Sequence, residues 1–171
     1  AHLSREDDNR HLVLAGPVHP RYQRNLVKLA RSLSIDSQIT WTGPLSGSMK
    51  WSAFATAQLF CLPSHQENFG VAVAESLSVG LPVCISSAVN IADMVSQAGA
   101  GLVHSDTLAG TSDALVRWSR MDKPARSQMS HSASQLFSSE FHWEQATQHF
   151  ADLLLIHYNS KCQAAVPQSY L

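Results

Sequence analysis

Five short apolar runs, separated by segments with helical spacing, constrain the fold of this chain more than any other feature. The runs are HLVLA at 11–15, QITWTG at 38–43, LFCLP at 59–63, PVCIS at 82–86 and GLVH at 101–104. Strands that alternate with helices in this way form a parallel sheet. We therefore expect an α/β fold with a doubly wound parallel sheet and helices on both faces.

The spacers predict the helices of this fold. In the first spacer, Tyr22, Leu26, Leu29, Ala30 and Leu33 recur at intervals of three and four, which places them on one helical face, and Pro20 suits the first turn. Further helices are expected over 48–57, 69–79, 90–97, 107–120 and 124–138, with a long amphipathic one from about 142 to 158. We expect one domain over 1–171, with its core at about 10–138.

Composition excludes several classes of function. The net charge of −1 and the scattered Lys and Arg residues disfavour a nucleic-acid partner. No stretch has the roughly 18 consecutive apolar residues of a membrane span, and the first ten residues lack the apolar core of a signal peptide. Three widely separated cysteines predict reduced thiols and a cytoplasmic protein, with peripheral membrane attachment left open. Neither cysteines nor histidines have metal-ligand spacing, so we expect no metal.

The most informative segment is the loop between the third and fourth runs. Ligands of open α/β sheets bind beyond the carboxyl ends of the strands, where the loop 63–70 lies. Gly70 allows close approach of the backbone to a ligand. The unpaired amides of Phe69, Gly70, Val71 and Ala72 would point outward at a helix start, and such a start binds phosphate.

Three side chains flank this helix start. Glu75 lies in the second turn of an otherwise apolar helix and leans back toward its amino terminus, where it could accept hydrogen bonds from the two hydroxyls of a ribose. Glu67 could do the same for sugar hydroxyls. The alternative is that Glu75 is a surface residue stabilised by the helix dipole and Glu67 an ordinary loop acid. His65 could transfer protons, but nothing close in sequence orients it, so we favour a role in positioning the loop.

The motif Glu67-Asn68-Phe69-Gly70, followed by Glu75 and by Gly80-Leu81-Pro82-Val83, resembles the carboxyl-terminal domain of the retaining family 4 glycosyltransferases of the GT-B fold, also called glycosyl transferases group 1. Other segments agree in order and spacing: LVLAGP at 12–17, ITWTG at 39–43, GAGLV at 99–103 and FHW at 141–143. The resemblance extends from about residue 10 to 158. It implies a Rossmann-like domain, the carboxyl-terminal half of a GT-B enzyme.

The resemblance also implies roles for individual residues. Glu67 is expected to be the catalytic residue that contacts the donor sugar, and Glu75 to hold the ribose. The backbone of residues 68–72 (Asn68, Phe69, Gly70, Val71 and Ala72) is expected to bind the sugar and the diphosphate. Gly16, Leu45 and Lys50 would line the nucleotide pocket. For Lys50, a solvated lysine on a helix is an equal alternative.

The implied activity is transfer of a hexose, with retention, from a nucleoside-diphosphate sugar to an acceptor in glycan or glycolipid synthesis. No cofactor or metal is expected. The acceptor, whether glycan, lipid or small molecule, would bind an amino-terminal domain that is absent here, so the fragment alone should be inactive. A nucleotide-sugar epimerase of the same fold and a non-catalytic nucleotide-binding module are the alternatives.

One departure from the family concerns the sheet. Relatives open this domain with a strand that would lie between the runs at 11–15 and 59–62, and this sequence begins after it. Those neighbours could pair directly, a segment of another chain could fill the gap, or an upstream segment could do so. Because an unpaired edge recruits a strand, we expect a homodimer through that edge.

Overall fold

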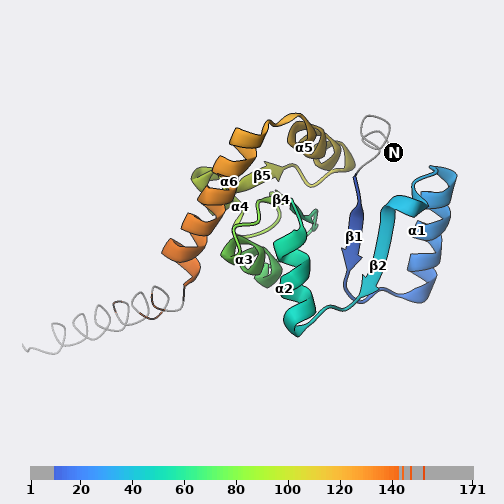
Figure 1. The fold of residues 1–171 in the computed structure, drawn as a ribbon, viewed down its shortest axis with the longest axis horizontal. Coiled ribbons are helices and arrows are strands. Elements are labelled where there is room, and N and C mark those ends of the chain that lie inside the picture. Colours follow the sequence, from blue (N-terminus) through green and yellow to red (C-terminus); the bar gives the residue numbers. More distant parts are fainter. Residues whose placement is uncertain (1–9, 143, 145–146, 148–151, 153–171) are drawn as a thin grey trace, which may run out of the picture.

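The computed structural model describes residues 10–142 together with 144, 147 and 152. The elements lie close to their predicted ranges (Figure 1). The strands are β1 (Leu12–Ala15), β2 (Ile39–Gly43), β3 (Phe60–Leu62), β4 (Val83–Ser86) and β5 (Gly101–His104). The helices are α1 (Pro20–Ser32), α2 (Gly47–Thr56), α3 (Val71–Ser78), α4 (Ala92–Ala98), α5 (Leu108–Arg120) and α6 (Lys123–Leu136), with a 3-10 turn η1 (Asp36–Gln38) and a π-helical turn η2 (Phe137–Phe141). Most of the helix predicted over 142–158 lies outside the described residues.

The strands form two parallel sheets rather than the single sheet that was expected. One contains β1 and β2, and the other has the order β3-β4-β5. Direct pairing of β1 with β3, one of the three arrangements left open by the sequence, is therefore wrong. The crossover between the sheets is α2, whose Phe54 packs edge-on against Phe60 of β3. Figure 1 shows β1, β2 and α1 beside the rest of the molecule.

The core surrounds β4, which is buried along its whole length. One cluster, on one side of this sheet, joins α3, α4 and α6 through Val73, Leu77, Val95 and Ala133. A second cluster includes Cys84 of β4, Leu102 of β5 and Ala114 of α5. Because helices cover both faces, β4 tolerates an uninterrupted apolar run, and the α/β architecture with parallel strands flanked by helices is confirmed.

The first sheet is covered less completely. The helix α1 begins as predicted, with Pro20 in its first turn after His19, whose ring accepts a hydrogen bond from the Arg21 amide. Its apolar face is nevertheless largely exposed, and Ala30 is its only buried residue. Leu12 and Val13 of β1 are 48% and 50% exposed. Within the described residues, no helix combines the length and apolar character needed to cross a membrane.

Candidate functional site

The loop that follows β3 is tied to the loop that follows β4. The Glu67 amide donates to the Ala88 carbonyl at 3.4 Å, and the Asn90 amide donates to the Glu67 carbonyl at 3.2 Å. The Ser86 hydroxyl also donates a hydrogen bond to the Ser64 carbonyl. These bonds fix the backbone of Glu67 at the carboxyl edge of the β3-β4-β5 sheet, where the sequence placed it.

The helix start after this loop is capped by a glycine. Gly70 caps α3 in the left-handed conformation, with φ +71°, so the helix begins at Val71, two residues later than expected. The Gly70 carbonyl accepts hydrogen bonds from the amides of Val73 and Ala74. For the amides of residues 69–72, the structure records no acceptor within its described part. The described part of the chain therefore leaves these donors unpaired, with Gly70 itself buried.

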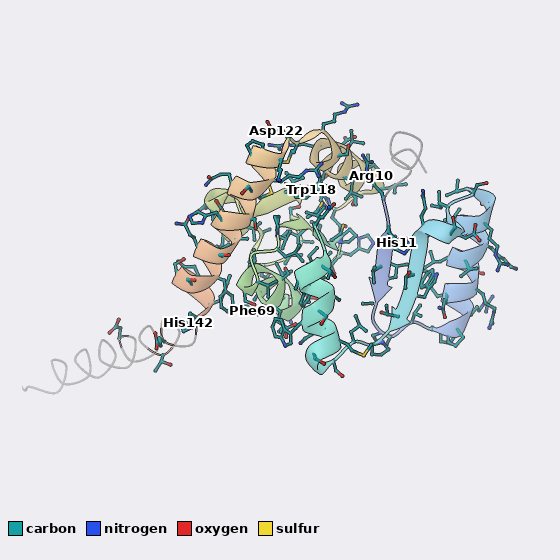
Figure 2. The ribbon with its side chains drawn as sticks, in the orientation of Figure 1. Arg10, His11, Phe69, Trp118, Asp122 and His142 are labelled. Atoms are coloured by element: carbon teal, nitrogen blue, oxygen red, sulfur yellow. The ribbon has the colours of Figure 1, made fainter. Side chains whose placement is uncertain are left out.

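The Glu67 side chain packs against this helix start. A Cβ atom added to Gly70 would lie 3.5 Å from Cγ of Glu67 and 3.1 Å from Cγ2 of Val73. The next two side chains are exposed, and Phe69, which is labelled in Figure 2, also makes an edge-on contact with Phe141 at a centroid distance of 5.6 Å. The segment therefore exposes Asn68, Phe69 and Val71, while Gly70 among them is buried.

Lys50 and Glu75 form an ion pair that the sequence did not reveal. Nζ of Lys50, on α2, lies 2.5 Å from Oε1 of Glu75, on α3, and the two side chains are only 30% and 25% exposed. The Lys50 ammonium also lies 5.1 Å from the ring centroid of Trp51. Neither residue is thus a solvated surface charge, and the two predicted site residues contact each other directly. Only the fold could show this, since 25 positions separate them.

Gly16 and Leu45 lie on the other sheet. Gly16 follows β1, with its amide bonded to the Gly43 carbonyl at 2.9 Å, and Leu45 follows β2. Both are partly buried and lie just beyond the carboxyl ends of parallel strands, the edge where ligands of open α/β sheets bind. Because β1 and β3 do not pair, the structure does not unite them with Glu67 along one sheet edge.

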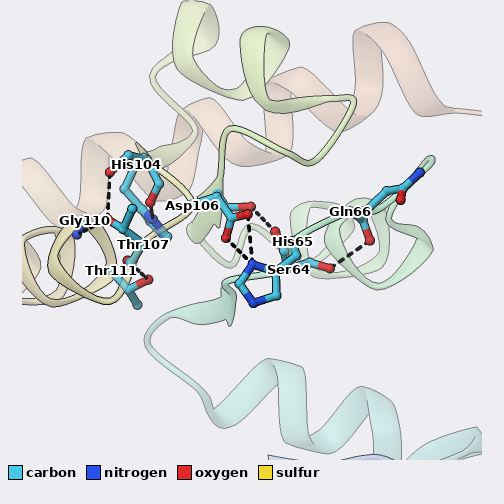
Figure 3. Close-up of polar contacts among 10 residues, drawn as sticks. Ser64, His65, Gln66, His104, Asp106, Thr107, Gly110 and Thr111 are labelled. Carbon is cyan, nitrogen blue, oxygen red and sulfur yellow. Dashed lines mark hydrogen bonds and ion pairs between the residues drawn. The ribbon is translucent and has the colours of Figure 1, made fainter.

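A histidine and an aspartate also meet at the carboxyl edge of the second sheet (Figure 3). Nδ1 of His65, after β3, lies 2.7 Å and 2.9 Å from the two carboxylate oxygens of Asp106, after β5. Sequence reasoning found His65 but missed Asp106, 41 positions away. The available signal was that both residues directly follow strands of one parallel sheet.

Two hollows recorded on the described surface lie elsewhere. The larger, about 1010 Å³, is an open groove between α4 and the segment formed by α6 and η2. The other lies along α5, next to Arg117 and Arg120. Neither includes Glu67, Gly70 or Glu75, so the candidate site is the start of α3 and not one of these hollows.

Comparisons with known proteins identify the family of this chain. Residues 1–135 match the family model described as glycosyl transferases group 1. A D-inositol 3-phosphate glycosyltransferase from Mycolicibacterium paratuberculosis is 30% identical over 134 residues, which cover 78% of this chain and 29% of that protein. The chain thus spans less than a third of this curated relative.

Solved structures show the same fold. Sucrose-phosphate synthase from Thermosynechococcus elongatus superposes with a TM-score of 0.73 at 18% identity, over 88% of this chain and 39% of that one. Anabaena HepE, in complex with UDP and glucose, superposes with a TM-score of 0.73 at 18% identity, over 84% of this chain and 40% of that one. Together with the family match, these similarities show that the chain belongs to the glycosyl transferases group 1 family and has the fold of a GT-B glycosyltransferase domain.

Proposed function

We propose that this chain is the donor-binding domain of a retaining glycosyltransferase of family 4, which transfers a hexose from a nucleoside-diphosphate sugar. The observation that carries this proposal is the start of α3, where the amides of residues 69–72 lack partners in the described structure and Glu67 packs beside them. Unpaired amides at a helix start bind phosphate through direct hydrogen bonds and the helix dipole.

The proposed roles follow from this arrangement. The amides of residues 69–72 hold the diphosphate, and charge that develops on it as the sugar departs is stabilised there. Glu67 accepts hydrogen bonds from the sugar and orients it for reaction. Glu75 binds the ribose hydroxyls through the oxygen that Lys50 does not occupy, and Lys50 neutralises part of the nucleotide's charge. Gly16 and Leu45, beyond the carboxyl ends of β1 and β2, would complete the nucleotide pocket.

The whole enzyme's reaction is part of the proposal, since the chain covers only 40% of HepE, which was solved in complex with UDP and glucose. The acceptor, a glycan, lipid or small molecule, would bind a separate amino-terminal domain that closes over the donor. Transfer in glycan or glycolipid synthesis therefore requires both halves. This fragment should bind a donor and transfer nothing.

A binding screen tests the proposal. Isothermal titration calorimetry would compare how tightly the chain and its Glu75→Gln variant bind the nucleotides UDP, GDP and ADP and the sugar nucleotides UDP-glucose, GDP-mannose and ADP-glucose. Since a hydrogen bond to a charged group contributes about 1.5–3 kcal/mol, the variant should bind the preferred nucleotide about 10- to 150-fold more weakly. Glu140→Gln, at an exposed acid of η2, is the control. The proposal fails if no compound binds, or if Glu75→Gln binds as well as the control.

We propose further that neither a metal nor a cofactor is required, because main-chain amides and Lys50 supply the positive charge at the site. Donor affinity should then be the same with and without EDTA. In the cell we place the protein in the cytoplasm, at most peripheral to a membrane.

Among the described residues, the outer edges of β1 and β3 have no strand partner, which also supports the proposal of a homodimer in which a second copy supplies a strand. Light scattering should give twice the mass of one chain. A monomer at all concentrations would contradict it.

A further inference from the structure

The pair formed by His65 and Asp106 gives the candidate site a fixed imidazole. An ionised carboxylate only accepts hydrogen bonds, so Nδ1 of His65 carries the proton that is shared between the two oxygens of Asp106. Fixing one ring nitrogen in this way also fixes the role of the other. In the neutral ring, Nε2 is then a hydrogen-bond acceptor, and the structure records no partner for it within the described residues.

Both ends of the pair are held by their own loops. Asp106 precedes Thr107, the cap of α5, whose hydroxyl accepts a hydrogen bond from the Gly110 amide at 3.0 Å and lies 3.1 Å from the Ser105 hydroxyl (Figure 3). On the other side, the Ser64 hydroxyl donates to the Gln66 carbonyl at 2.9 Å. The imidazole is therefore oriented from two strands of the sheet and not by a flexible loop alone.

Stability does not account for this arrangement. The His65 side chain is 90% exposed, and exposed ion pairs contribute little to folding. The loop is already closed by the backbone bonds of Glu67 with Ala88 and Asn90. What the pair does achieve is to set the direction and the tautomer of an exposed ring two residues before Glu67.

We propose that His65, positioned by Asp106, contacts the donor through Nε2 by accepting a hydrogen bond from a hydroxyl of the transferred sugar. A phosphate oxygen at neutral pH has no proton to donate to this nitrogen, whereas a sugar hydroxyl has one. The sugar is also the part of the donor assigned to the neighbouring Glu67. The inference rests on the proposed function, and it names a residue that discriminates a sugar nucleotide from the free nucleotide.

Two substitutions test the two ring nitrogens of His65 separately. His65→Asn keeps an amide donor near the position of Nδ1, so it preserves the bond to Asp106 and removes Nε2. His65→Gln instead reaches the position of Nε2 with a group that can accept. Gln66→Ala, at the exposed neighbouring residue, is the matched control. Asp106→Ala removes the anchor and leaves the ring in place.

The experiment measures the dissociation constants of the tightest-binding pair among UDP and UDP-glucose, GDP and GDP-mannose, and ADP and ADP-glucose. His65→Asn should bind the free nucleotide like wild type and the sugar nucleotide about 2- to 12-fold more weakly, which corresponds to one net hydrogen bond. His65→Gln should recover part of this loss, and Asp106→Ala should show a smaller loss of the same kind. Thermal unfolding should be the same for His65→Asn and Gln66→Ala.

The other outcomes each decide the question. An equal loss of affinity for the free nucleotide and for the sugar nucleotide would assign His65 to the phosphates or to loop structure, and it would overturn the inference. The inference would also be overturned if His65→Asn bound both compounds with wild-type affinity. If the wild-type chain binds none of the six compounds, the proposed function itself fails and the inference falls with it.

Discussion

Lys50 and Glu75 show how a single contact joins the two helices that border the candidate site. The pair is partly buried, so each charge depends on the other for compensation. Lys50→Met should lower the free energy of unfolding by about 1 kcal/mol, and adding Glu75→Gln should restore part of it. Urea unfolding of both single variants and the double variant measures this coupling. Strict additivity of the two changes would show that the ion pair contributes nothing.

Cys61 and Cys84 are in-register partners on β3 and β4, and their thiols interact. The hydrogen bond from Cys84 lowers the pKa of Cys61, although partial burial opposes this, and the same bond together with burial raises the pKa of Cys84. A lowered pKa means that Cys61 becomes a reactive thiolate at a lower pH than an ordinary cysteine.

Mass-resolved alkylation should therefore modify Cys61 well before Cys84. Replacing Cys84 by Ala removes the hydrogen bond, so the midpoint of the rate of Cys61 alkylation against pH should move upward. An unchanged midpoint, or faster modification of Cys84, would contradict this assignment.

At the scale of elements, the amino terminus of α3 depends on the left-handed conformation of Gly70. Gly70→Ala should lower the free energy of unfolding by about 1 kcal/mol or more. Alanine is strained in the left-handed backbone conformation, and its Cβ would approach Val73 and Glu67. Gly99→Ala is a matched control, since Gly99 has φ +64°, caps α4 and has nothing within 4 Å of an added Cβ.

Thermal unfolding should show a loss of stability in both glycine variants. Calorimetry should show loss of nucleotide affinity only in Gly70→Ala. If both variants bind nucleotide equally well, the helix start is not the binding element.

Local patterns predicted the elements well and their association less well. Alternating apolar runs located all five strands, and Pro20, Gly80 and Gly99 marked helix ends near their observed positions. The pairing of Lys50 with Glu75 and of His65 with Asp106 could not be predicted, because each joins segments that only the tertiary fold brings together. The division into two sheets was also not predictable from strand propensity, since it depends on which edges find a partner.

At the scale of the molecule, the described residues form a well-packed part around β4 and a sparsely attached part that contains β1, β2 and α1. Exposed Leu12 and Val13 show that this second part buries little apolar surface. Regions with few buried contacts open at low free energy. Hydrogen exchange should therefore be faster for the amides of β1 and β2 than for those of β4. Equal protection of both sheets in the isolated chain would show that the first part is held by contacts absent from this account.

The central claim is that the amides opening α3 bind a diphosphate, and a titration followed by two-dimensional ¹H-¹⁵N NMR tests it most directly. On addition of the nucleoside diphosphate with the highest affinity, the amide signals of Gly70, Val71 and Ala72 should shift together and saturate with one dissociation constant. Shifts confined to the groove between α4 and α6, or none in residues 69–72 at saturating nucleotide, would contradict the account.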